Sequence, residues 1–276
     1  MSNVIDNVDF KSKNTQVAIA DKVIIGNNVI VGPNCKKFTV GFGSFLGNDC
    51  YIDVPEFNMG DYTTIHKHTT VHGYKSFSIG HNCWIGQFCV IDSIGGTTIG
   101  NNVGVGAHSQ LWSHIKFGDS LEGCRWNNEK ELIVEDDVWF VGHCIVSPIL
   151  ARKRSMLLVG GVITKNMEEN HVYAGSPAKD ITDKVGYQFM EKSIEDKKKE
   201  FHSLYLSFLE IKGITEDRFR ATCIETLEGK TSKENETFFD IGNRLYLPTR
   251  SEYEYEFIKY MLYEKGKFLP VQESCT

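Results

Sequence analysis

The chain has 276 residues, of which 41% are hydrophobic and 24% are charged, the composition of an ordinary globular protein. Its formal net charge of −6 argues against a nucleic-acid partner. No apolar run reaches the roughly 18–20 residues of a membrane span, and the first residues, MSNVIDNVDFKSKN, lack the apolar centre of a signal peptide. We therefore expect a cytoplasmic protein without membrane insertion.

A repeat of six residues begins near residue 19. Apolar residues, here called anchors, recur in six triplets: Ile19, Ile25 and Val31; Val40, Leu46 and Ile52; Met59, Ile65 and Val71; Ile79, Ile85 and Ile91; Ile99, Val105 and Leu111; Val134, Phe140 and Val146. The spacing is six within every triplet, and it is nine, seven, eight, eight and twenty-three between successive triplets. Neither a strand nor an α-helix has this period. The pattern predicts an all-β solenoid of three-sided coils, with every insertion at one corner.

A small residue stands four positions after every first and second anchor and after Val31, where a side chain would face the interior at a tight corner. These residues are Val23, Val29, Cys35, Ser44, Cys50, Thr63, Thr69, Cys83, Cys89, Val103, Ser109, Val138 and Cys144. Five of the eight cysteines of the chain are among them. Cysteine acting as a small apolar residue explains this placement, so we expect neither disulfides nor a metal site.

The repeat weakens after Val146, and the composition changes near residue 183. The stretch SPILARKRSMLLVGGVITKN predicts a last coil that lacks one residue, with Arg152–Lys153–Arg154 in place of an aliphatic-glycine start. Further on, the patterns predict a helix over 187–212, a strand over 237–247 and a second helix over 250–264. We expect a β-helix of about seven coils at 1–182 with an external loop at 117–133, followed by an α+β domain at 183–276 with two helices.

From about residue 17 to residue 182 the chain resembles the left-handed parallel β-helix, hexapeptide-repeat acyltransferases. Two local matches carry the resemblance besides the repeat: VEDDVWFVGHCIVSP at 134–148 and GGVITKNMEENHVYAGSPAKDI at 160–181. The resemblance implies a homotrimer that binds acetyl-CoA, or another acyl-CoA, in grooves between subunits, without a metal.

The resemblance also implies that His114 is the catalytic base, because sugar-acetylating members carry a histidine just before a surface loop. As its orienting partner we favour Asp92, which occupies the coil position of Trp112 one coil earlier. Asp119 and Glu122 on the loop remain alternatives. His68, His108 and His143 each stand three residues after a second anchor, and His108 or His143 of an adjacent subunit is a weaker candidate for ligand contact.

Further residues are assigned by the same resemblance. Lys165 and Lys179 match positions near the nucleotide end of CoA, and Arg152–Lys153–Arg154 adds positive charge. Gly160, Gly161 and Thr164 let the pantetheine arm approach the backbone, and backbone N–H groups near Gly142 and Gly160 are candidate oxyanion donors. The residues expected to contact the acceptor are Trp112, Arg125, Trp126, Asn127 and His143.

These assignments predict an acetyl-CoA-dependent acetyltransferase of a sugar amine or hydroxyl, in nucleotide-sugar or surface-polysaccharide biosynthesis. The acceptor would attack the thioester directly while His114 takes its proton. Two alternatives stay open: an acetyltransferase of a small amine antibiotic or amino acid, and a non-catalytic trimeric scaffold. Binding of acetyl-CoA separates the enzymes from the scaffold.

Overall fold

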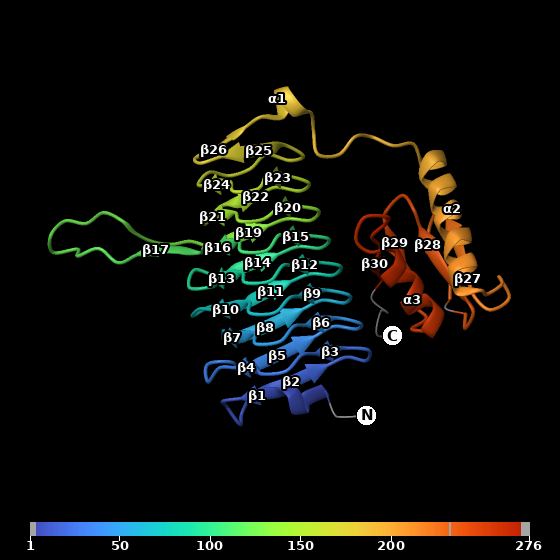
Figure 1. Ribbon diagram of the computed structural model, residues 1–276, viewed down its shortest axis with the longest axis horizontal. Helices are drawn as coiled ribbons and strands as arrows, with labels where there is room; N and C mark the ends of the chain where they lie inside the picture. The colour runs from blue at the N-terminus through green and yellow to red at the C-terminus, as the bar shows by residue number, and fades with distance from the viewer. Residues whose placement is uncertain (1–3, 232, 272–276) are drawn as a thin grey trace. The chain divides into compact units, whose positions relative to one another are not determined.

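The computed structural model describes residues 4–231 and 233–271 (Figure 1). The chain forms two compact units, Met1–Phe189 and Met190–Thr276, so the boundary falls after residue 189, whereas the sequence pattern put it after 182. The ends of both expected domains, at 1–3 and 272–276, lie outside the described residues. Within the described ranges, no helix is both long and apolar enough to cross a membrane.

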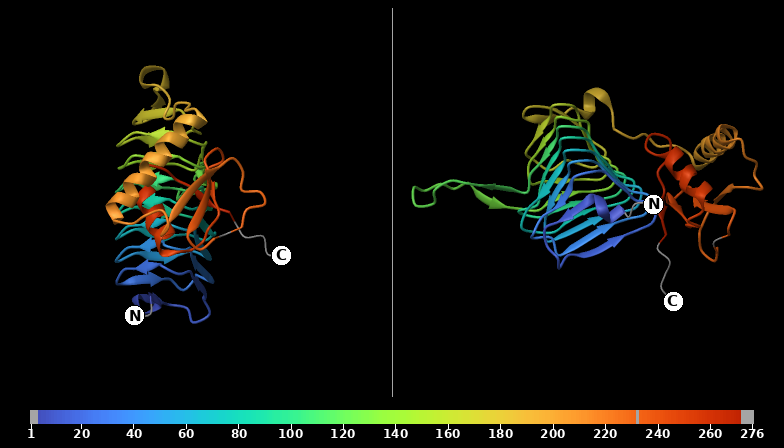
Figure 2. Two further views of the ribbon diagram at one scale, coloured as in Figure 1. Left: turned by 90° about the vertical axis from the view of Figure 1, so that its right-hand side faces the viewer. Right: turned by 60° about the horizontal axis from the view of Figure 1, so that its bottom comes forward.

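The first unit is a left-handed parallel β-helix with three sheets, and Figure 2 (right) shows its triangular section. Sheet 1 carries the first anchors and contains β2 (Gln16–Ile19), β5 (Lys37–Val40), β8 (Glu56–Met59), β11 (Phe77–Ile79), β14 (Thr97–Ile99), β19 (Leu132–Val134) and β22 (Leu150–Ala151). Sheet 2 carries the second anchors and contains β3 (Ile24–Ile25), β6 (Phe45–Leu46), β9 (Thr64–Ile65), β12 (Trp84–Ile85), β15 (Gly104–Val105), β20 (Trp139–Phe140), β23 (Met156–Leu157), β25 (Val172–Gly175) and the antiparallel β26 (Ala178–Asp180). Sheet 3 carries the third anchors and contains β1 (Val8–Phe10), β4 (Val29–Val31), β7 (Tyr51–Asp53), β10 (Thr70–His72), β13 (Val90–Asp92), β16 (Gln110–Leu111), β21 (Ile145–Val146) and β24 (Val162–Ile163).

The anchors form the core of this unit. Every anchor is buried except Ile19 in the first coil, which is half-buried. All thirteen small corner residues are buried as well. Several of the polar ones donate to carbonyl groups of the next coil, for example Thr63 Oγ1 to Gly80 (2.7 Å) and Cys83 Sγ to Gly100 (3.1 Å). These bonds give corner carbonyls a side-chain donor.

The cysteines that the structure describes are all free. Burial raises the pKa of the Cys35, Cys50 and Cys89 thiols to about 11. A thiol with such a pKa is a poor nucleophile at neutral pH, which is consistent with a packing role. No group of three or more metal-ligating side chains lies together in the described part of the chain.

The seventh coil differs from the sequence-based expectation. Its anchors are Ala151, Leu157 and Ile163, which are again six residues apart and pair with Val134, Phe140 and Val146. The spacing of five between Val146 and Ala151 absorbs the missing residue at the corner, so the register of the strands is unchanged. Arg152 follows the first anchor, Ala151, at the position where several other coils have a glycine.

The external loop is an arm rather than an irregular segment. Its base is an antiparallel pair formed by β17 (His114–Lys116) and β18 (Asn127–Glu129), and it leaves the side of the β-helix (Figure 1). The expected loop at 117–133 was therefore placed about three residues too late. Residues 132–134 already belong to β19 of sheet 1.

The ends of the β-helix are covered by short elements. A 3-10 helix, η1 (Val4–Asn7), precedes β1. At the other end β25 and β26 form a hairpin that leads into α1 (Thr182–Val185).

The second unit is an α+β domain. It contains α2 (Ile194–Lys212), β27 (Arg220–Ile224), β28 (Glu236–Asp240), β29 (Leu245–Tyr246), α3 (Glu252–Met261) and β30 (Leu269–Pro270), and its strands form one sheet in that order. The expected helix at 187–212 begins only at 194, because Ser193 caps it by accepting from the Asp196 N–H. Ser251 caps α3 in the same way. The expected strand at 237–247 is a hairpin of two strands, and β27 and β30 were not predicted.

Candidate active site

His114 and Asp92 form a hydrogen-bonded pair at the corner between sheets 3 and 1. Asp92 ends β13, and the register of β13 with β16 places it beside the start of the segment that leads to His114. His114 Nδ1 lies 2.8 Å from Asp92 Oδ2. The Asp92 side chain is fully buried, whereas one fifth of the His114 side chain is exposed. The dyad therefore has a fixed inner member and an outer member that solutes can reach.

Asp92 is held by several donors besides His114. Ser113 donates to Oδ2 twice, from its backbone N–H (2.9 Å) and from its hydroxyl (2.6 Å), and the Ile94 N–H points at Oδ1 (3.3 Å). The Ser113 hydroxyl in turn accepts from the Gly95 N–H (2.9 Å). Because a backbone N–H only donates, Oδ2 is an acceptor. It therefore accepts a hydrogen bond from the Nδ1–H of His114, which leaves Nε2 as the ring nitrogen whose lone pair can accept a proton.

The surroundings of His114 come from the coil and the arm. The Trp112 ring lies 6.0 Å from the imidazole at an interplanar angle of 64°. Glu129 pairs with His114 across the arm, and its carboxylate accepts from Lys116 Nζ (2.6 Å). That hydrogen bond lowers the pKa of Glu129 below its usual range. Lys116 thus favours the charged form of the Glu129 carboxylate and holds it in a hydrogen bond.

The alternative partners of His114 lie elsewhere. Asp119 Oδ1 accepts from the backbone N–H groups of Leu121 (2.8 Å) and Glu122 (3.4 Å), so Asp119 shapes a turn within the arm. Of the acceptor candidates on the arm, Asn127 lies opposite Lys116. Arg125 and Trp126 are exposed and lie beyond this last pair. Within one chain, Trp112 is the only one of the five acceptor candidates with a ring contact to His114.

The residues expected to bind CoA are divided between two corners. Gly142, Gly160 and Gly161 lie between sheets 2 and 3, before β21 and β24, and the acceptor candidate His143 lies at the same corner. Thr164 and Lys165 are exposed and follow β24, at the same corner as His114. A side of the triangle spans about five residues, or about 15 Å. One chain therefore keeps the glycine group apart from His114, on the opposite edge of sheet 3.

The glycine corner has the backbone freedom that the sequence suggested. Gly142 has φ +151° and Gly160 has φ +71°, and no atom lies within 4 Å of the place where a Cβ of Gly160 would be. The Gly160 N–H is already used, since it donates to the Gly142 carbonyl (3.0 Å). Of the two expected oxyanion donors, the Gly160 N–H is thus engaged within the coil.

The basic stretch Arg152–Lys153–Arg154 does not join the other CoA candidates. It connects β22 to β23 and lies at the corner between sheets 1 and 2. Arg152 Nε lies 3.6 Å from a Glu168 carboxylate oxygen, and the Arg154 guanidinium lies over the Phe189 ring at 5.4 Å. Because the seventh coil starts at Ala151, this stretch lies at a different corner from Lys165, and its contribution of charge to CoA binding stays a prediction. Lys179 is exposed on β26, and β26 contacts β24.

The histidines after the second anchors form a stacked column that the sequence only partly revealed. The rings of His68, Phe88, His108 and His143 stack with centroid distances of 4.7, 5.1 and 4.9 Å. All four residues have φ between 50° and 60°. Phe88 interrupts the histidines, and a search for histidine alone misses it. The column lies at the corner between sheets 2 and 3, across sheet 3 from His114.

The chain has some likeness to known acetyltransferases. No protein-family model matches the chain. A Schizosaccharomyces pombe protein named "Putative acetyltransferase" is 31% identical over 115 residues, which are 40% of this chain and 52% of that protein. The chain thus spans about half the length of this curated relative.

Two solved structures illustrate the likeness. The polySia specific acetyltransferase NeuO is 19% identical, with 73% of this chain and 99% of that chain covered and a TM-score of 0.46. A hexapeptide-repeat acetyltransferase of Vibrio cholerae, complexed with acetyl-CoA, is 16% identical, with 51% and 68% covered and a TM-score of 0.36. In sequence pattern and coil architecture, the chain is similar to hexapeptide-repeat acetyltransferases.

Proposed function

We propose that this chain is an acyltransferase that carries the acetyl group of acetyl-CoA to an amine or hydroxyl of a sugar. The observation that carries the proposal is the His114–Asp92 pair, with one buried and one accessible member, at the base of the arm. The likeness to hexapeptide-repeat acetyltransferases supports acetyl-CoA as the donor. A sugar acceptor in nucleotide-sugar or polysaccharide biosynthesis rests on the match of His114 to the base of sugar-acetylating members.

In the proposed reaction, the acceptor attacks the thioester carbonyl carbon directly. The Nε2 lone pair of His114 takes the proton that the attacking nitrogen or oxygen loses. Asp92 holds the imidazole in this tautomer and stabilises the imidazolium that forms. The tetrahedral intermediate collapses with cleavage of the carbon–sulfur bond, and the leaving thiolate of CoA takes the proton back from His114. No residue of the chain becomes acylated.

The positions of the two groups of candidate residues favour an active site that lies between subunits. His114 and Thr164 lie on one edge of sheet 3, and Gly142 and Gly160 lie on the other. If both sets serve one reaction, the first edge of one copy must meet the second edge of another. The outward residues of sheet 3 include Tyr51, Val90 and Ile145, which suit such an interface. A homotrimer, as the family resemblance implies, would provide three such sites.

Release of free thiol from acetyl-CoA tests the proposal. Wild-type protein is assayed with nucleotide-linked amino sugars, plain sugars and small amines, beside His114→Ala and His68→Ala. His68 is a suitable control, because its Nε2 also lies near a carboxylate, that of Asp49 at 3.8 Å. We expect turnover with one sugar class, a loss of about 10²–10⁴-fold in His114→Ala, and little change in His68→Ala.

Three outcomes would contradict it. Full turnover in His114→Ala would remove His114 as the base. Turnover with small amines but no sugar would change the acceptor class. Wild-type protein that neither binds acetyl-CoA nor releases thiol would favour the scaffold.

A further inference from the structure

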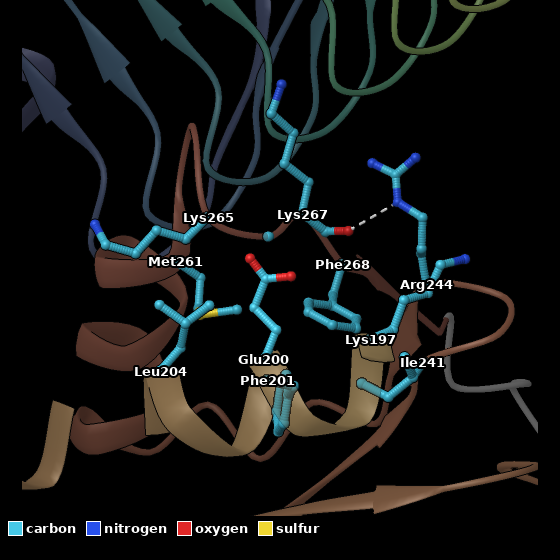
Figure 3. Close-up of a pocket in the computed structure, with 11 residues that line it drawn as sticks. Lys197, Glu200, Phe201, Leu204, Ile241, Arg244, Met261, Lys265, Lys267 and Phe268 are labelled. Atoms are coloured by element: carbon cyan, nitrogen blue, oxygen red, sulfur yellow. Dashed lines mark hydrogen bonds between the residues drawn. The ribbon is translucent and has the colours of Figure 1, made fainter. Parts of the chain in front are cut away.

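The second unit contains a pocket that the proposed acyl transfer does not use. Figure 3 shows it between α2, the start of β29 and the segment after α3. Its cavity volume is about 140 Å³. The floor is apolar, because Phe201, Ile241, Met261 and Phe268 line it and are each less than a tenth exposed. The Phe201 and Phe268 rings meet edge to face at 5.6 Å, which fixes the shape of the floor.

The remaining lining is mainly cationic. The charged lining residues are four cations, Lys197, Arg244, Lys265 and Lys267, and one carboxylate, that of Glu200. The Glu200 carboxylate also forms an ion pair with Lys192, which lies just before α2 in the chain. Lys197, Arg244 and Lys267 are half-buried, so their charges are less screened by water than those of fully exposed side chains.

Arg244 is held in place at the rim. Its Nε donates to the Lys267 carbonyl at 3.3 Å, as the dashed line in Figure 3 marks. The backbone around it is fixed too, because the Leu269 N–H donates to the Arg244 carbonyl (2.8 Å). An oriented guanidinium beside a lysine is a suitable partner for a carboxylate or a phosphate.

The size of the floor limits the apolar part of a ligand. A cavity of about 150 Å³ lined by apolar side chains accommodates one benzene molecule. An apolar floor with a few charged groups at the rim is typical of small-molecule sites. We propose that this pocket binds a small organic anion, in which one carboxylate or phosphate is joined to a single six-membered ring or an alkyl group of that size.

Ligand titrations of the full chain, followed by NMR of labelled methyl groups, test this proposal. Met261 and Ile241 report from the floor, and Met59 in the β-helix is the internal control. The probes are benzoate and phenyl phosphate, with benzyl alcohol and inorganic phosphate as controls that lack the charge or the ring. We expect saturable shifts at Met261 and Ile241 with at least one of the anionic ring compounds, no shift at Met59, and much weaker binding of both controls.

Variants separate the rim from general charge effects. Arg244→Gln combined with Lys267→Gln should weaken binding about tenfold or more, because each removes a charge-assisted hydrogen bond. Lys199→Gln removes one positive charge from α2 outside the lining and should leave the affinity within about twofold. Unchanged thermal unfolding of the variants shows that they fold, and Lys197→Gln replaces the double variant if it does not.

The proposal is overturned if neither anionic probe gives saturable shifts. It is also overturned if inorganic phosphate or benzyl alcohol binds as tightly as the ring anions, or if the rim variants bind as the wild type does. Thiol release from acetyl-CoA is measured separately, so failure of one proposal leaves the other standing.

Discussion

Ser113 stands between Trp112 and His114 in the chain and has its side chain buried against Asp92. Nothing in the sequence singles out this serine, because it is neither an acid nor a base. The structure shows that it donates two hydrogen bonds to Asp92 Oδ2. The pairing of Asp92 with His114, in contrast, was accessible from counting, because residues at equal coil positions stack. The difference is that backbone register follows from the repeat, whereas side-chain direction depends on what fills the space.

Ser113→Ala tests this positioning role. Loss of the hydroxyl removes a hydrogen bond to a carboxylate, worth about 1.5–3 kcal/mol, and lets Asp92 and His114 move. We expect kcat to fall about tenfold or more, with the KM for acetyl-CoA unchanged. Ser93→Ala is the control, since Ser93 is a buried serine one coil earlier and donates to the Ser76 carbonyl instead. Equal losses in both variants would indicate a structural effect only.

The β-helix tolerates inserted residues at one corner of a coil, but it does not tolerate additional side-chain atoms where two neighbouring coils are in contact. The spacing of 23 residues between Leu111 and Val134 exceeds the six-residue repeat by seventeen, yet the register of β14 with β19 is undisturbed. Glycine after an anchor has a different function, because the next coil runs directly over it. A Cβ on Gly106 would lie 1.8 Å from the Val141 carbonyl oxygen. The hexapeptide glycines are therefore required by stacking rather than by turn conformation.

Gly106→Ala is expected to destabilise the β-helix. The contact is with backbone, which cannot rotate away, so the free energy of unfolding should fall by about 3 kcal/mol or more. Gly104→Ala is the matched control on the same strand, because its Cβ would meet only the Trp139 side chain, at 3.0 Å. Denaturant unfolding followed by circular dichroism measures both variants. A smaller loss in Gly106→Ala than in Gly104→Ala would contradict the account.

The closing hairpin of the β-helix carries a pH-dependent contact. Partial burial raises the pKa of the Asp180 carboxyl, but hydrogen bonds from Thr182 and His171 outweigh it and lower the pKa to about 2. Thr182 Oγ1 and N lie 2.6 and 2.9 Å from Oδ1, and His171 Nδ1 lies 2.6 Å from Oδ2. A depressed pKa stabilises the folded state above the ordinary value of 3.8 and loses this contribution as the pH falls toward 2.

We therefore expect amide protection in β25–β26 and α1 to be constant above pH 4 and to fall between pH 4 and pH 2. Hydrogen exchange at Val172 and Ile181 measures it, since both N–H groups are bonded within this cap. Asp180→Asn should show lower protection at neutral pH and a flatter profile. An Asp180→Asn profile identical to that of the wild type would contradict the assignment.

The whole β-helix has one largely polar face and faces that carry apolar side chains. Sheet 1 presents Lys37, Glu56, Ser78 and Thr98 outward, and sheet 3 presents apolar residues such as Ile145. Both groups of candidate site residues also border sheet 3. The candidate site residues and these apolar side chains thus share one face of the β-helix.

Ile145→Asp is expected to dissociate the proposed homotrimer and to abolish thiol release. Ile133→Asp is the control, because Ile133 is 37% exposed on sheet 1 and Ile145 is 40% exposed on sheet 3. Light scattering after size-exclusion chromatography measures the mass of both variants. If Ile145→Asp keeps the wild-type mass, sheet 3 is not the interface.

The sequence alone determined the coils, their three sides and the corner that takes insertions, because stacking of each residue on the equivalent one in the next coil forces a periodic pattern. It also indicated which carboxylate lies near His114. The tertiary structure decided what the period cannot encode: the start of the seventh coil at Ala151, the arm that begins at His114, and the division of the candidate site across sheet 3. The fold of the second unit also came from the structure, since β27 pairs with β28 across a loop and has no repeat to reveal it.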